Sequence, residues 1–111
     1  MDQPFSTRVV RVDGATVIYI QGEIDMSTAG RLRDAIEPHM GPDQTIMLDL
    51  SGVDFMDSAC IKVLVQARGR LTQDGGSLIL RNPSSAAHRL LTITGVEFIL
   101  AKDADDNPES N

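Results

Sequence analysis

The sequence predicts a single α/β domain with a mixed β-sheet of 4-5 strands and helices packed mainly on one face. Short β-branched or apolar runs alternate with amphipathic stretches in the order β-β-α-β-α-β-α-β. The length of 111 residues, 41% of them hydrophobic, suits one compact core. Two continuous apolar runs, residues 46–50 and 78–80, flank one helical stretch, which is typical of a right-handed parallel crossover. We expect the domain to span residues 1–100 and the acidic tail, residues 101–111, to be disordered.

The chain is expected to begin with a β-hairpin. Residues 8–12 and 15–20 are β-branched runs on either side of Asp13-Gly14, a dipeptide that favours a two-residue turn. Residues 22–25 follow as an expected polar loop.

A first helix and a buried strand come next. Ser27 or Thr28 is expected to cap the helix. Its core face would carry Ala29, Leu32, Ala35 and Ile36. Pro38 ends the helix, and the short apolar run at residues 46–50 predicts a strand buried on both faces.

The second helix is predicted over residues 58–73 and is stopped by Gly75-Gly76. At about 100° per residue, one face of this helix would pack on the sheet. That face holds Cys60, Leu64, Ala67 and Leu71. Ile61 and Val65 fit neither this face nor the solvent face, so they either pack against a neighbouring element or form an exposed apolar strip.

The last elements are a strand at residues 78–80, a third helix and a final strand at residues 96–100. Ser84 or Ser85 is the expected cap of the helix, and Gly95 its terminator. The core residues expected from this helix are Leu90, Leu91 and Ile93.

Composition argues against several classes of function. Aromatic residues make up 4% of the chain and the net charge is −6, which oppose direct nucleic-acid binding. No apolar run approaches the roughly 20 residues of a membrane span, and there is no secretory h-region. The single cysteine, Cys60, precludes an internal disulfide. We therefore expect a cytoplasmic protein, monomeric by default.

The sequence also gives little support to catalysis. Ser58 is not in a G-x-S-x-G elbow, and His39 and His88 are both distant from it in the chain. These two histidines and Cys60 lack the spacing of metal ligands, and no glycine-rich nucleotide loop occurs. We expect no enzyme activity, no metal and no cofactor.

The strand-to-helix junction at Asp57-Ser58 is the main candidate site. A helix start offers free backbone N–H groups and the positive end of the helix dipole, so it accommodates a phosphate well. Serine is also an ordinary helix cap, and the two roles are compatible. A phosphate here would sit beside Asp57 and Asp25 and the apolar side chains of Ile61 and Val65.

Several short motifs occur in a characteristic order between residues 8 and 100. They are Gly22-Glu23-Ile24-Asp25, Leu48-Asp49-Leu50-Ser51, Phe55-Met56-Asp57-Ser58, Asn82-Pro83 and Thr94-Gly95. Together they resemble the anti-sigma-factor antagonist family, the small single-domain STAS proteins. The resemblance implies a STAS fold and a regulatory binding protein that acts by partner switching in transcription regulation, as in a stress response.

In that family, the unphosphorylated protein binds an anti-sigma factor that is also a serine kinase, and this frees a sigma factor. The kinase phosphorylates the serine that matches Ser58, the phosphoprotein releases the kinase, and a PP2C-type phosphatase reverses the modification. The resemblance also implies that Asp25 belongs to the recognition surface, although a role in its own loop turn is an alternative.

Two features depart from the family pattern. Ala59 and Cys60 replace the usual Ser/Thr and Gly, and the acidic tail lacks the apolar stripe of a closing helix. An alternative therefore remains: a STAS scaffold, a stressosome-type subunit or a small-ligand-sensing subunit in which Ser58 is not phosphorylated.

Overall fold

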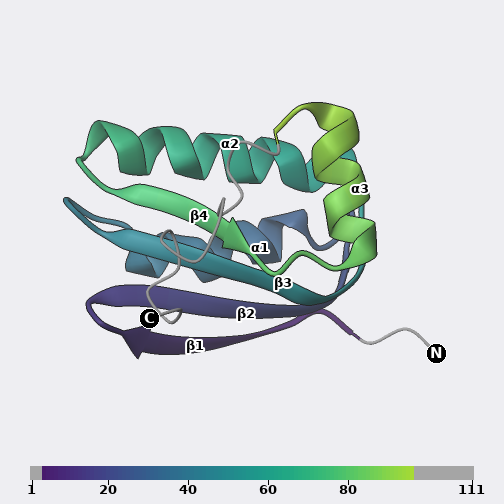
Figure 1. The fold of residues 1–111 in the computed structure, drawn as a ribbon, viewed down its shortest axis with the longest axis horizontal. Helices are drawn as coiled ribbons and strands as arrows, with labels where there is room; N and C mark the ends of the chain where they lie inside the picture. The colour runs from purple at the N-terminus through teal and green to yellow at the C-terminus, as the bar shows by residue number, and fades with distance from the viewer. Residues whose placement is uncertain (1–3, 97–111) are drawn as a thin grey trace.

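A computed structural model describes residues 4–96 and shows a four-stranded mixed sheet (Figure 1). The strand order is β1-β2-β3-β4. β1 (Ser6–Val12) is antiparallel to β2 (Ala15–Ile24), whereas β2, β3 (Thr45–Met56) and β4 (Ser77–Arg81) are mutually parallel. The predicted fold class is confirmed.

The hairpin between β1 and β2 turns at Asp13 and Gly14, as the sequence predicts. Val12 pairs with Ala15, so only two residues form the loop. Both have positive φ angles, 51° at Asp13 and 82° at Gly14. This geometry is that of a primed turn, which matches the twist of the flanking strands.

β2 and β3 are longer than the sequence indicates. The expected polar loop at residues 22–25 is wrong for residues 22–24, because β2 continues to Ile24, which pairs with Met56 of β3. The pairing of β2 with β3 shifts in register between Tyr19 and Gln21 and between Gly22 and Glu23. The second half of β3 was not predicted because it contains the polar residues Ser51 and Asp54. Residues 46–50 are all buried, as predicted for a strand covered on both sides.

Three helices complete the described part of the chain: α1 (Ala29–Ile36), α2 (Ser58–Gln73) and α3 (Ser85–Thr94). A 3₁₀ turn, Glu37–His39, follows α1. α2 runs along the sheet, whereas α3 stands across its end (Figure 1).

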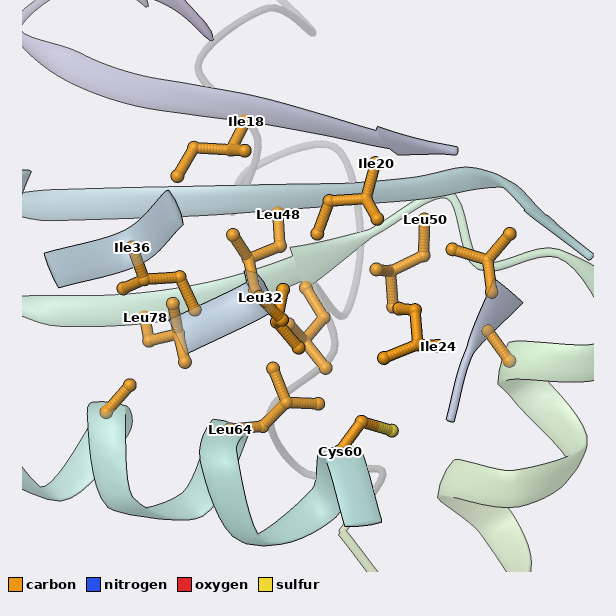
Figure 2. Close-up of a cluster of buried hydrophobic side chains, with 14 of the residues drawn as sticks. Ile18, Ile20, Ile24, Leu32, Ile36, Leu48, Leu50, Cys60, Leu64 and Leu78 are labelled. Atoms are coloured by element: carbon orange, nitrogen blue, oxygen red, sulfur yellow. The ribbon is translucent and has the colours of Figure 1, made fainter. Parts of the chain in front are cut away.

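The hydrophobic core lies between one face of the sheet and the helices. Figure 2 shows alternate residues of the sheet, such as Ile18 and Leu48, directed towards Leu32 of α1 and Leu64 of α2. The predicted core face of α2 is confirmed, because its buried residues are Cys60, Leu64, Ala67 and Leu71.

The third helix has the expected ends but not all of the expected core. Ser84 caps α3 by accepting a hydrogen bond from the Ala87 amide at 3.2 Å, and Gly95 ends the helix in the left-handed conformation. Leu91 is buried, but the expected core residue Ile93 is 74% exposed. Two positions along a helix correspond to about 200°, so Ile93 lies opposite Leu91.

The expected last strand, residues 96–100, and the acidic tail, residues 101–111, lie outside the described residues, apart from Val96. Within residues 4–96, no helix is both long and apolar enough to cross a membrane.

Candidate functional site

The candidate site forms where β2 and β3 end side by side. The two strands are paired up to Ile24 and Met56, and the amide of Asp57 donates a hydrogen bond to the Ile24 carbonyl at 3.0 Å. The loop that begins at Asp25 and the start of α2 are therefore neighbours. In sheets of this kind, functional sites lie at the carboxyl ends of parallel strands.

At the start of α2, the cap is Asp57 rather than Ser58. The Asp57 backbone is extended and its carboxylate accepts a hydrogen bond from the Ala59 amide at 2.8 Å. Ser58 is the first residue of the helix and is exposed. In the part of the chain that the structure describes, the Ser58 hydroxyl makes no side-chain hydrogen bond. It is therefore accessible and not required to hold the helix.

Asp25 organises the neighbouring loop. Its Oδ1 accepts hydrogen bonds from the Ser27 hydroxyl at 2.6 Å, the Ser27 amide at 2.9 Å and the Thr28 amide at 3.1 Å. Thr28 is the cap residue of α1; its hydroxyl accepts from the Asp25 amide and donates to the Glu23 carbonyl. The turn role of Asp25 is therefore real, and its half-buried side chain lies at the edge of the site.

The same hydrogen bonds affect the charge of Asp25. The hydrogen bond from the Ser27 side chain, together with those from the Ser27 amide and from Thr28, lowers the pKa of the Asp25 carboxyl despite some desolvation. The Asp25 loop, which neighbours the start of α2, therefore carries a negative charge at neutral pH.

The two apolar residues of the predicted strip differ in environment. Ile61 is half-buried and packs against the core, whereas Val65, one turn further along α2, is 44% exposed. The structure thus shows Ile61 in the packing role that the sequence left open, with part of its surface still exposed.

Two further exposed apolar residues lie close to the site residues in the sequence and were missed by sequence reasoning. Met26 follows Asp25 directly and is 84% exposed, and Phe55 near the end of β3 is 46% exposed. An apolar residue inside a polar turn, Asp25-Met26-Ser27, was the signal available for Met26. Exposed Met and Phe side chains are typical of protein-binding surfaces.

Cys60 lies under the site but is chemically protected. It is fully buried, and its thiol donates to the Asp57 carbonyl with 2.8 Å between Sγ and the oxygen. Burial, and then the charge of Asp57, raise the pKa of the Cys60 thiol to about 12. The thiol is therefore protonated and unreactive at physiological pH.

A second polar cluster lies on the sheet face opposite the helices. Asp49 accepts hydrogen bonds from the Ser51 amide at 3.0 Å and from Arg81 Nε at 3.1 Å, and the Arg81 guanidinium also donates to the Tyr19 hydroxyl at 2.9 Å. The ion pair between Asp49 and Arg81 was not predicted from the sequence. Burial alone would raise the pKa of Asp49, but hydrogen bonds from Ser51, Asn82 and Arg81 outweigh it and lower the pKa.

Within residues 4–96, the histidines do not contact Ser58, and the acidic side chains and Cys60 do not gather into a metal site. Neither His39, in the 3₁₀ turn, nor His88, on α3, forms a hydrogen bond with Ser58 within residues 4–96. Over the same residues, no three His, Cys, Asp or Glu side chains are grouped so that they could hold a metal ion.

Comparison with known proteins agrees with this fold. The STAS domain family matches residues 6–108. The chain is 34% identical over 84 residues to the anti-sigma-B factor antagonist of Listeria monocytogenes, covering 75% of this chain and 74% of the relative. It is 35% identical over 83 residues to the anti-sigma-B factor antagonist of Bacillus subtilis, covering 75% and 76% of the two chains.

Solved structures give the same result. An anti-sigma factor antagonist from Mycobacterium paratuberculosis superposes with a TM-score of 0.77 at 30% identity, covering 93% of this chain and 90% of the other. The unphosphorylated form of SpoIIAA shares the fold, with a TM-score of 0.71 at 21% identity over 86% of each chain. On these matches, the chain belongs to the STAS domain family, among the anti-sigma factor antagonists.

Proposed function

We propose that this protein is an anti-sigma factor antagonist controlled by phosphorylation of Ser58. In its unphosphorylated form it binds an anti-sigma factor that is also a serine kinase, and a sigma factor is released. Phosphorylation of Ser58 ends the binding, and a PP2C-type phosphatase restores it. The role is that of a binding protein rather than an enzyme, and it implies a cytoplasmic location, because ATP and the sigma factor are found there.

The observation that carries the proposal is the exposed hydroxyl of Ser58 at the first position of α2. A kinase needs access to the hydroxyl, and this one is exposed without a structural hydrogen bond among residues 4–96. The cap of α2 is supplied by Asp57, so modifying Ser58 removes no contact that holds the helix. Its position beside the Asp25 loop gives a kinase a fixed surface to recognise.

The protein itself should tolerate the phosphate. A phosphoserine carries about −1.5 to −2 charges, and the start of a helix favours negative charge. Lys62, exposed and one turn after Ser58, is the only basic residue between residues 54 and 66. We therefore expect the fold to persist after phosphorylation.

A bound partner would not tolerate it. The interface would have to desolvate a dianion that follows Asp57 in the chain and neighbours the loop holding Asp25 and the exposed Met26. Ile61 and Val65 lie about one and two turns further along α2. A thousandfold loss of affinity corresponds to only about 4 kcal/mol. One poorly paired buried dianion is sufficient for a change of that size.

The experiment compares Ser58→Ala and Ser58→Asp with a matched control, Ser85→Asp. Ser85 is likewise the exposed first residue of a helix and also follows a side-chain cap. Binding to the anti-sigma factor is measured by calorimetry, and phosphorylation by mass spectrometry after incubation with that kinase and ATP. We expect Ser58→Ala and Ser85→Asp to bind like the wild type, Ser58→Asp to lose binding while staying folded, and the phosphate to map to Ser58.

Tight binding by Ser58→Asp would refute the charge switch. A chain that is not phosphorylated at all would favour the alternative, a STAS scaffold, stressosome-type or ligand-sensing subunit. Ala59 and Cys60 stand where the family usually has Ser or Thr and Gly, so the phosphorylation measurement distinguishes the two functions.

A further inference from the structure

A groove lies between α1 and α2, on the side of α2 away from the exposed Val65. It has a volume of about 380 Å³, within the range of small-molecule sites. Its apolar lining comes from Ile36, Met40, Val63 and Ala67. Val63 and Val65 are two positions apart, or about 200°, so they lie on opposite flanks of α2.

The groove is open because the two helices differ in length and the wall of α2 is lined by small residues. α1 ends at Ile36 and a 3₁₀ turn with Pro38 follows, whereas α2 continues to Gln73. Ala67 and Gly69 leave space: a Cβ added at Gly69 would meet no atom within 4 Å. Gly69 has no positive φ that would require glycine, although glycine in a helix costs about 0.5–1 kcal/mol relative to alanine.

The rim of the groove is positively charged in a chain of net charge −6. It carries Arg33 and Arg70 and a single acid, Glu37. Arg70 pairs with Glu37 at 3.5 Å and Arg33 with Asp34 at 3.8 Å, and all four side chains are at least 46% exposed. Exposed pairs of this kind contribute little, so either guanidinium can exchange its partner for a ligand.

We propose that this groove binds an amphipathic carboxylic acid with a linear apolar chain. The chain packs against Ile36, Met40 and Val63, and the carboxylate pairs with the guanidinium of Arg33 or Arg70. An apolar floor favours the hydrocarbon. Arginine provides a fork of N–H donors that matches a carboxylate, so the rim selects an acid over an amine. This site is separate from Ser58 and does not depend on its phosphorylation.

The test uses dodecanoate as the probe, below its micellar concentration, with dodecylammonium and dodecanol as comparators. Binding is measured by calorimetry, and its location by the shifts of backbone amide resonances. We expect saturable binding of dodecanoate, shifts confined to α1, the 3₁₀ turn and the second half of α2, and weaker binding of both comparators.

Two pairs of variants locate the interaction. Val63→Phe fills the groove and should weaken dodecanoate binding at least about tenfold, whereas Val65→Phe, the same change on the other flank, should not. Removing both positive charges of the rim by Arg33→Gln and Arg70→Gln should abolish the preference for dodecanoate over dodecanol. Arg89→Gln on α3 should leave this preference unchanged. Absence of saturable binding, equal binding of dodecylammonium, or equal effects of the two phenylalanine variants would overturn the proposal.

Discussion

Asp57 and Ser58 are adjacent but have separate tasks at the start of α2. The carboxylate of Asp57 holds the first turn through the Ala59 amide, and the hydroxyl of Ser58 is exposed. The sequence left the cap ambiguous, because aspartate and serine are both preferred there. The backbone decides: Asp57 has φ −115° and ψ 178°, outside the helix, and Ser58 is already inside it.

The cap can be separated from the charge of Asp57 by substitution. Asp57→Ala removes the acceptor for the Ala59 amide and should lower the free energy of unfolding by about 1 kcal/mol. Asp57→Asn keeps a good cap and removes the charge, so it should be nearly as stable as the wild type. Urea denaturation of both variants measures the difference. Equal stability of Asp57→Ala and Asp57→Asn would contradict the assigned cap.

At the scale of elements, three polar side chains in register link three strands on the sheet face away from α1 and α2. Asp49 of β3 is paired in register with Tyr19 of β2 and with Arg81 of β4. The Asp49 and Arg81 side chains are 4% and 3% exposed, so the ion pair is buried. A buried charge without its counter-charge is costly, and the pair therefore helps to fix the register of these strands.

The substitution Asp49→Asn tests the role of the ion pair between Asp49 and Arg81. At pH 7 it should lower the free energy of unfolding by about 3 kcal/mol, because the buried Arg81 loses the charge that compensates it. The folded-state pKa of Asp49 is below its unfolded value of 3.8, so its stabilising contribution is present above that pH and is lost as the pH falls through the folded pKa. Denaturation of both proteins between pH 7 and pH 2 measures the difference in free energy of unfolding between the wild type and Asp49→Asn. This difference should become smaller only below about pH 4. If the difference in free energy of unfolding did not change with pH, the charge of Asp49 would not be its cause.

The order and type of the elements could be predicted from sequence, whereas partners across strands could not. The Asp-Gly turn and the apolar stripe of α2 are local patterns, and both were correct. The ion pair between Asp49 and Arg81 joins residues 32 apart, and it follows only from the register of β3 on β4. The prediction that Ile93 is a core residue was wrong for a different reason: its apolar character says nothing about the side of the helix on which it lies.

The candidate site could be predicted only in part, because some of its features depend on contacts between elements and not on local patterns. Ser58, Asp57 and Asp25 could be found because they stand at element boundaries. The exposure of Met26 depends on how its turn folds around Asp25, and the partial burial of Ile61 depends on the core beside α2. The polar neighbours of Met26 were a local signal for its exposure, but no local pattern contains the partial burial of Ile61.

At the scale of the whole molecule, β1 is an outer strand of the four-stranded sheet. An exposed edge strand can pair with the edge of another molecule, and charged side chains oppose this. β1 carries Arg8, which stacks on Tyr19, and Arg11, which hydrogen-bonds to Thr16. Two cations along seven residues favour the monomer that the sequence predicts.

Removing both charges should therefore increase self-association. We expect the wild type to sediment as a monomer and the double variant Arg8→Thr, Arg11→Thr to form a concentration-dependent dimer. A double variant with the same change of charge on helices, Arg33→Thr with Arg89→Thr, is the control and should remain monomeric. Analytical ultracentrifugation distinguishes these outcomes. A monomeric edge variant would show that the arginines are not what keeps the edge unpaired.

The division between Asp57 and Ser58 has an evolutionary consequence. Because the serine contributes little to folding, a codon change there would yield a protein that matures normally and escapes proteolytic surveillance. Under the proposed role of Ser58, such alleles would be permanently active or permanently silent without any loss of abundance. Selection on this position would then act through gene expression alone.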